Sequence, residues 1–279
     1  MNLALVLPLL LSVVGRSADT PLPNPQQLKQ RTLQSLKNSE KELEKYSCMV
    51  RSETDELNAD GSIKKKKTAD RERFFVNGVE IDHDLTRDGK PLSPRDAKKE
   101  QDRVNYEVKK YSDPKQVQER HARDEKQIDM FLKALQFKDE RRERRDARNT
   151  IVFDLSGDPD FHPRSLDERF AQAMVGRIWI DEETGNVDEM RAQTVHDIKI
   201  GGGLIASVHK GFRVALVQQR QLGGVWIAKM VEGVGDARAA LFLHPRFRFR
   251  EDLDKCHLFS VETKQSIQGP EIPPPGAKP

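Results

Sequence analysis

The stretch IWIDEETGNVDEM, residues Ile178–Met190, holds five carboxylates around a Gly-Asn pair. Acidic side chains gather in this way both in metal-binding loops and at the exposed tips of hairpins. A calcium loop that began at Asp181 would need Gly at its sixth position and Glu at its twelfth. Here Gly stands at the fifth position and Ala192 at the twelfth, so the sequence does not fit a calcium loop.

The same stretch fits a β-hairpin. Gly185-Asn186 separates two runs of strand-forming residues, and such a pair is a turn signal. Side chains alternate along a strand, so Ile178 and Ile180 are expected to point together toward a core and Trp179 toward the opposite face. We expect the five carboxylates to lie at a solvent-exposed tip.

Further strands are predicted at close, regular intervals from residue 175 to residue 262. Segments 212–216 and 246–250 alternate apolar side chains with polar or charged ones. A period of two predicts a sheet with one apolar face and one wet face. The apolar face needs a cover, which helices elsewhere in the chain can provide.

The N-terminal half supplies those helices. An apolar stripe at helical spacing begins after Gln26, with charged residues opposite, and predicts an amphipathic helix. Its members are Leu28, Leu33, Leu36, Leu43 and Tyr46. Strands with turns at Asp60-Gly61 and Asp88-Gly89 follow. Ser93-Pro94 predicts the start of a charged helical segment that breaks at Asp113-Pro114. The arginine-rich run 141–148 is interpreted as a solvated strand or loop.

The first residues contain an apolar run, Leu3 to Val14, followed by small residues. A run of this length is typical of a signal peptide and too short to span a bilayer. We expect export from the cytoplasm, cleavage near residues 15–18, a Pro-rich leader at 19–25 and a disordered Pro-rich tail at 264–279. Any membrane association is expected to be peripheral.

Export gives the two cysteines two interpretations. Cys48 and Cys256 lie near opposite ends of the mature chain. In an oxidising compartment they can form a disulfide, which would stabilise the fold by roughly 5 kcal/mol in the chain-entropy model. Alternatively, each is a separate buried thiol within a strand. The sequence leaves both open.

Composition and motifs argue against several classes of function. A net charge of +3 with mixed signs does not indicate a nucleic-acid partner. Metalloprotease, serine-hydrolase, P-loop and zinc-ligand patterns are missing from the sequence. We therefore expect a non-enzymatic protein with no cofactor and no metal. A hydrolase with a site assembled from separated residues is the weakest alternative.

Three segments carry a family resemblance: GRIWIDEETGNVDEMRAQ, GGLIASVHKGFRVALVQQ and GGVWIAKMVEGVGDARAALFLHPRFRFRED. They resemble the LolA-like outer-membrane lipoprotein-sorting proteins of the bacterial periplasm, as does DGKPLS at residues 88–93. The resemblance implies an α+β fold, an incomplete, strongly curved antiparallel β-barrel with helices over its concave face. It covers a single domain at residues 26–263 with a charged helical insertion around 94–136. The carriers' cavity arginine has three candidate equivalents here, Arg51, Arg71 and Arg73.

The resemblance and the strand alternation together predict a hydrophobic cavity that sequesters an acyl chain of a lipid or an acylated protein. The predicted lining residues are Phe212, Val214, Leu216, Trp226, Met230, Phe247 and Phe249. The alternative function is an envelope protein-interaction or stress-sensing module on the same fold, without lipid cargo. In that case the charged helical insertion would contact the protein partner.

Overall fold

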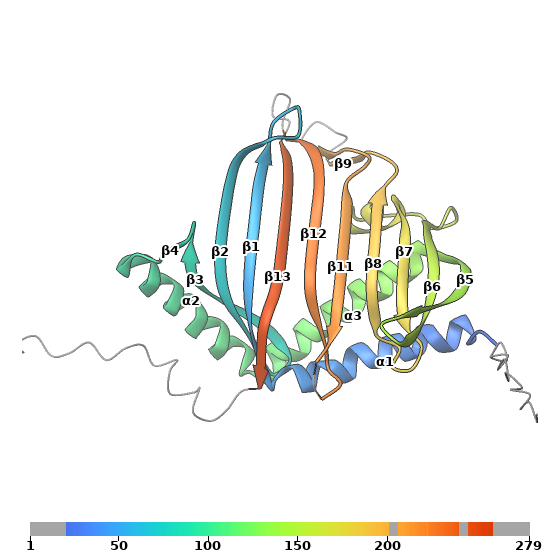
Figure 1. The fold of residues 1–279 in the computed structure, drawn as a ribbon, viewed down its shortest axis with the longest axis horizontal. Helices are drawn as coiled ribbons and strands as arrows, with labels where there is room; N and C mark the ends of the chain where they lie inside the picture. Colours follow the sequence, from blue (N-terminus) through green and yellow to red (C-terminus); the bar gives the residue numbers. More distant parts are fainter. Residues whose placement is uncertain (1–20, 201–205, 222, 240–244, 259–279) are drawn as a thin grey trace, which may run out of the picture.

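The computed structural model describes residues 21–200, 206–221, 223–239 and 245–258 (Figure 1). The expected signal peptide at 1–18 and the Pro-rich tail at 264–279 lie outside the described residues.

The helices are α1 (Pro25–Leu43), α2 (Pro94–Tyr111), α3 (Pro114–Ala134) and α4 (Leu166–Gln172). The strands are β1 (Tyr46–Leu57), β2 (Ile63–Val76), β3 (Val79–Arg87), β4 (Lys90–Pro91), β5 (Leu135–Arg145), β6 (Arg148–Gly157), β7 (Met174–Asp181), β8 (Val187–Thr194), β9 (Ile198–Ile200), β10 (Ala206–Val208), β11 (Arg213–Arg220), β12 (Trp226–Ala239) and β13 (Arg246–Leu258).

The strands form one antiparallel sheet in the order β4-β3-β2-β1-β13-β12-β11-β8-β7-β6-β5, and β10 pairs with both β12 and β9. The sheet is curved, and among the described strands its end strands β4 and β5 do not pair with each other. Figure 1 shows α1 and α3 running across the sheet rather than along its strands. This arrangement confirms the expected α+β class with an unclosed, curved sheet.

The two faces of the sheet follow from its register. Ile178 on β7 lies opposite Met190 on β8, which in turn lies opposite Leu216 on β11. Paired residues share a face, so these side chains and Phe249 on β13 lie on one face, which we call the inner face. Trp179 lies on the other, outer face, as its alternation with Ile178 predicts.

Helix α1 begins at a cap and covers the inner face. The Oδ1 atom of Asn24 accepts hydrogen bonds from the amides of Gln26 at 2.9 Å and Gln27 at 3.3 Å. Leu28 is 1% exposed and packs into the core formed by β6 and β7. The predicted amphipathic helix is confirmed as far as Leu43, but Tyr46, which the predicted stripe included, begins strand β1, and the side chain of Leu36 lies outside the described part of the chain.

The charged helical segment is also confirmed. Ser93 caps α2 and Asp113 caps α3, at the positions where the sequence predicts a start and a break. Helix α2 packs against the hairpin of β2 and β3 through Val104 and Tyr111. The buried Glu100 accepts a hydrogen bond from the amide of Asp84 at 2.8 Å, which ties α2 to β3. Helix α3 then leads directly into β5.

Cys48 and Cys256 form a disulfide between β1 and β13. The bridge lies in a small core that also contains Tyr46, Val50 and Leu253. Of the two alternatives that the sequence leaves open, the structure has the bridge. It joins the first strand of the chain to the last, so it closes a loop that contains nearly all of the described residues.

The hairpin expected at Ile178–Met190 is confirmed as β7 and β8, but the prediction for its carboxylates is wrong. Asp181 is 0% exposed, Asp188 is 7% exposed and Glu189 is 4% exposed. Only Glu183 of the five is exposed. Carboxylates of this kind are buried in proteins when cations and hydrogen-bond donors satisfy them.

The cations come from the arginine-rich β5–β6 hairpin next to them. Arg148 places its Nη1 atom 2.9 Å from Asp181 and its Nη2 atom 3.4 Å from Asp188. Arg145 reaches both Asp188 and Glu189. The run 141–148 is therefore a strand and turn, as expected, but the side chains of Arg142, Arg145 and Arg148 are only 21–31% exposed, and each is paired with an acid.

Candidate functional site

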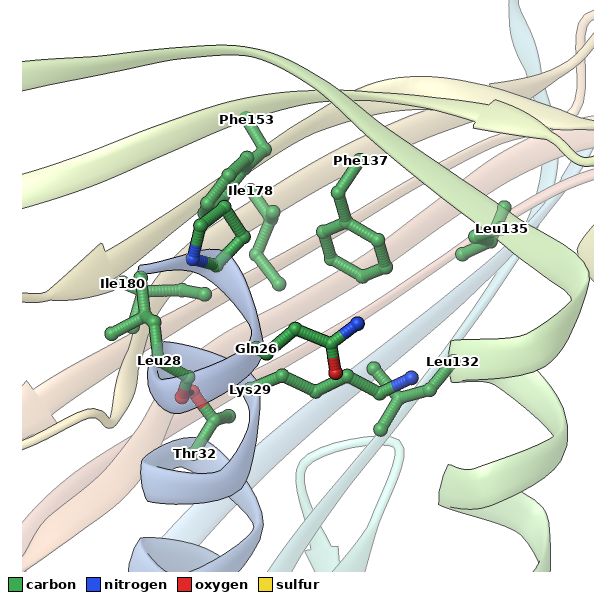
Figure 2. A pocket seen from close by; sticks show the side chains of 11 residues that line it. Gln26, Leu28, Lys29, Thr32, Leu132, Leu135, Phe137, Phe153, Ile178 and Ile180 are labelled. Atoms are coloured by element: carbon green, nitrogen blue, oxygen red, sulfur yellow. Dashed lines mark hydrogen bonds between the residues drawn. The ribbon is translucent and has the colours of Figure 1, made fainter. Parts of the chain in front are cut away.

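An apolar pocket of about 230 Å³ lies between α1, the end of α3 and strands β5 to β7 (Figure 2). It is lined by Pro25, Gln26, Leu28, Lys29, Thr32, Leu132, Leu135, Phe137, Phe153, Ile178 and Ile180. Ligand sites in proteins are concave and mostly apolar, with a few polar groups that fix orientation. This pocket has that character, but it is smaller than the sites that hold whole drug-sized molecules.

The strands supply the floor of the pocket. Ile178 and Ile180 alternate along β7 and point to the inner face, where they are 9% and 4% exposed. Phe153 on β6 lies directly opposite Ile178 and is 3% exposed. Phe137 on β5 meets Phe153 edge to face, with ring centroids 5.8 Å apart. The floor is thus aromatic on the side of β5 and β6 and aliphatic on the side of β7.

Helices α1 and α3 supply the walls. Leu28 and Thr32 are one turn apart on α1, so they share the helix face toward the sheet. The hydroxyl of Thr32 donates to the carbonyl of Leu28 at 3.1 Å, which leaves its methyl group for the pocket. Figure 2 shows Gln26 and Lys29 extending from α1 toward Leu132 of α3. These side chains form the polar margin of the site.

None of the seven predicted lining residues lines this pocket. The structure brings three of them together elsewhere on the inner face. Phe212 is 8% exposed, 5.5 Å from the ring of Phe170 on α4 and 5.9 Å from the ring of Phe247. Phe249 lies over Gly233, where an added Cβ would come 2.1 Å from the ring. These aromatic rings fill space in this part of the sheet.

The other four are spread over the sheet. Val214 packs near Ala192 and lines a separate hollow with Arg191 and Arg213. Leu216 is on the inner face, opposite Met190.

Met230 lies opposite Val217, whose neighbour Leu216 faces inward, so Met230 is on the outer face. Trp226 is 3% exposed and lies beneath the guanidinium group of Arg148, at 4.6 Å from the ring centroid. Neither therefore faces the pocket.

Two of the three arginines proposed for the cavity lie in an ion-pair cluster on the inner face of β2. Arg73, with 9% of its side chain exposed, contacts Asp82 at 2.8 Å and Glu251 at 3.3 Å. Burial lowers the pKa of Arg73, but the Asp82 carboxylate and its neighbours reverse this, and the pKa lies above its ordinary value. Arg71 contacts Glu251 at 3.1 Å. Arg51 is exposed and does not join the cluster.

Sequence reasoning assigned none of the pocket-lining residues to a pocket; it placed Ile178 and Ile180 in the core and Leu28 in the apolar stripe of the N-terminal helix. One signal for the rest is present: Leu28 heads the apolar stripe of α1, and Leu132 near the end of α3 is followed three positions later by Leu135, the first residue of β5. What the sequence does not show is that these two helix ends meet over β5 to β7.

Within the described ranges, no group of three or more His, Cys, Asp or Glu side chains is arranged to hold a metal ion. Among the described helices, none combines the length and the hydrophobicity that a membrane crossing requires.

No protein-family model and no curated protein matches the sequence. Two solved structures are similar at the level of fold. One is a putative outer membrane lipoprotein-sorting protein domain from Vibrio parahaemolyticus, with 7% identity and a TM-score of 0.35 over 88% of this chain and 97% of that chain. The other is MucB in complex with MucA, with 9% identity and a TM-score of 0.23 over 85% of this chain and 100% of that chain. Similarities this distant do not show what this chain binds.

Proposed function

We propose that this protein is an exported binding protein that holds an acyl chain of a lipid or of an acylated protein in the pocket between α1, α3 and β5 to β7. The observation that carries the proposal is the pocket itself, whose floor consists of Phe137, Phe153, Ile178 and Ile180. Acyl chains need no directional contacts, because burial of their methylene groups is favourable in any apolar surrounding.

The size of the pocket sets the scale of binding. At about 30 Å³ per group, close to the share of a water molecule in the liquid, 230 Å³ holds about eight methylene groups. At about 0.8 kcal/mol each, their burial is worth about 6 kcal/mol. This is the gross gain from burial; the loss of translational and chain freedom on association opposes it, so the dissociation constant is expected to be weaker than the roughly 40 micromolar that about 6 kcal/mol alone would give. The pocket therefore fits part of a single chain rather than a whole two-chain lipid.

The disulfide supports the proposed location. Bridges such as Cys48–Cys256 persist in oxidising compartments and are rare in the reducing cytosol. The apolar run from Leu3 to Val14 has the length of a signal-peptide core. An exported protein with an acyl-chain pocket is suited to the bacterial periplasm, where lipid chains must be kept from water during transfer.

The experiment is a titration of the mature protein with fluorescent acyl-chain probes, together with mass spectrometry of lipids that copurify with it. In the matched variant Leu132→Trp, a large ring replaces a half-buried side chain at the margin of the pocket. The control is Leu258→Trp, the same change at a residue that is 60% exposed and outside the pocket. Saturable binding that Leu132→Trp weakens and Leu258→Trp leaves unchanged supports the proposal. Absence of saturable binding by the folded wild type contradicts it.

A second candidate function is binding of a protein partner through α2. Its buried side chains, Glu100, Val104 and Tyr111, attach one face to the sheet, whereas Tyr106 is 67% exposed. Exposed tyrosines are frequent at protein interfaces. A partner identified from an envelope extract that Leu132→Trp retains and Tyr106→Ala loses would favour this function over acyl-chain binding.

A further inference from the structure

The margin of the pocket carries a positive charge that has no counter-ion among the residues that the structure describes. Of the described residues that line the pocket, Lys29 alone is charged. Its side chain is half-buried, and no described acid lies within ion-pair distance of its ammonium group. Among the described lysines only Lys45, Lys64, Lys66 and Lys133 are paired with a carboxylate, so Lys29 is set apart by its half-buried place beside the apolar pocket rather than by the lack of a partner alone. An unpaired ammonium group beside an apolar hollow is a binding group for an anion.

The surroundings of Lys29 favour the same sign of charge. Pro25 and Gln26, at the first turn of α1, also line the pocket, and the amino end of a helix carries partial positive charge. Figure 2 shows the Gln26 and Lys29 side chains on the same side of α1, reaching toward Leu132. The Gln26 amide can donate a hydrogen bond, and the Lys29 ammonium group can donate three.

We propose that the pocket selects a single-chain amphiphile with an anionic head group, the chain lying on β5 to β7 and the anion meeting Lys29 and Gln26 at the margin. This inference rests on the proposed function and adds the chemical class of the ligand. A carboxylate and a phosphate monoester share the charge that Lys29 requires, so a fatty acid and an alkyl phosphate belong to the same class.

The geometry also determines which head groups are disfavoured. A quaternary ammonium head group would be held beside the Lys29 ammonium group, and like charges in a half-buried site repel. An alcohol with the same chain would bury as many methylene groups in the pocket, but its uncharged hydroxyl head group would not neutralise the Lys29 ammonium group. The contrast between head groups of equal chain length therefore isolates the contribution of Lys29 from that of the apolar floor.

The experiment is calorimetric titration of the mature protein with decanoate, decyl phosphate, decanol and decyltrimethylammonium, each below its micelle concentration. We expect decanoate and decyl phosphate to bind about fivefold more tightly than decanol, as for a partly exposed ion pair, and decyltrimethylammonium to bind most weakly. Lys29→Gln should remove the preference for anions and leave decanol binding unchanged, whereas Lys29→Arg should keep it. Lys65→Gln, on the exposed part of β2, is the control and should behave like the wild type.

Equal affinities of the wild type for the four head groups would overturn the inference, as would a preference for anions that persists in Lys29→Gln. Decanoate binding without decyl phosphate binding, or the reverse, supports it and identifies the head group. Failure of the proposed function is distinct: in that case none of the four compounds binds, and the variants behave alike.

Discussion

Replacement of Leu28 by Ala tests the fold and the pocket together. Leu28 is 1% exposed and contacts the inner-face residues of β6 and β7 while it forms one wall of the pocket. The change removes three carbon atoms, and loss of their burial costs about 2.4 kcal/mol. The new void adjoins an existing one and does not collapse, so a cavity term of about 1–2 kcal/mol adds to this. We expect the free energy of unfolding to fall by about 3.4–4.4 kcal/mol.

The assay is urea denaturation followed by circular dichroism, with Leu33→Ala as the matched control on the same helix. Leu33 is half-buried, so its truncation should cost about 1 kcal/mol. The enlarged pocket of Leu28→Ala should also accept about two to three more methylene groups, which shifts the preferred chain length upward in a fatty-acid series. A loss of stability no larger than that of Leu33→Ala, or an unchanged chain-length preference despite measurable binding, would refute the placement of Leu28.

Three further predictions concern the parts of the fold that hold the sheet together. The double variant Cys48→Ser, Cys256→Ser should lose up to about 5 kcal/mol in the free energy of unfolding, and reductant should lower the wild type to the same level; a wild type insensitive to reductant would contradict this. Arg148→Met should lower the free energy of unfolding, measured by denaturant titration, by about 3–5 kcal/mol, because it leaves the fully buried Asp181 carboxylate without its cation. Adding Asp181→Asn to this variant should restore part of the loss. If the losses of the two single variants simply add in the double variant, the two residues are not coupled and the prediction is wrong. Burial raises the pKa of Glu189, but two neighbouring arginines outweigh it and hold the pKa below its ordinary value. A carboxyl whose pKa is lower in the folded state than its unfolded value near 4.3 stabilises the protein above that pH, and this stabilisation is lost as the pH falls through the folded-state pKa. Glu189→Gln should therefore make the free energy of unfolding fall less steeply as the solution is acidified. The same steepness in the variant and the wild type would contradict this prediction.

The elements of this fold were predictable from the sequence because their signals are local. Gly185-Asn186 marks a turn whatever lies around it, and the alternation of Phe247 and Phe249 with arginines needs only neighbouring residues to show a two-faced strand. The caps Ser93 and Asp113 act within one helical turn. Each of these features requires contacts within a few positions along the chain, so the printed sequence contains all of the necessary information.

The pocket and the buried acids were not predictable in this way because both depend on which surfaces meet. Phe212 is as apolar as Phe153, but α4 places Phe170 over Phe212, whereas the space beside Phe153 stays open. The acids of 181–189 have the composition of an exposed tip, and only the arginines of the adjacent β5–β6 hairpin explain their burial. The positive charge of the run 141–148 complements the negative charge of residues 181–189, and this complementarity is the signal in the sequence that indicates their contact.

The buried acids also explain why the pocket lies where it does. Strand β7 places Ile178 and Ile180 in the floor of the pocket, and its next residue, Asp181, is held by Arg148 at the hairpin tip. The tip in turn holds α1: Arg31 donates to the carbonyl of Glu183 at 2.8 Å and to that of Glu182. Gly185, with a positive φ of 76°, lies so close to Arg31 that an added Cβ would come 3.1 Å from its backbone. The tip therefore holds α1 against the sheet at the edge of the pocket.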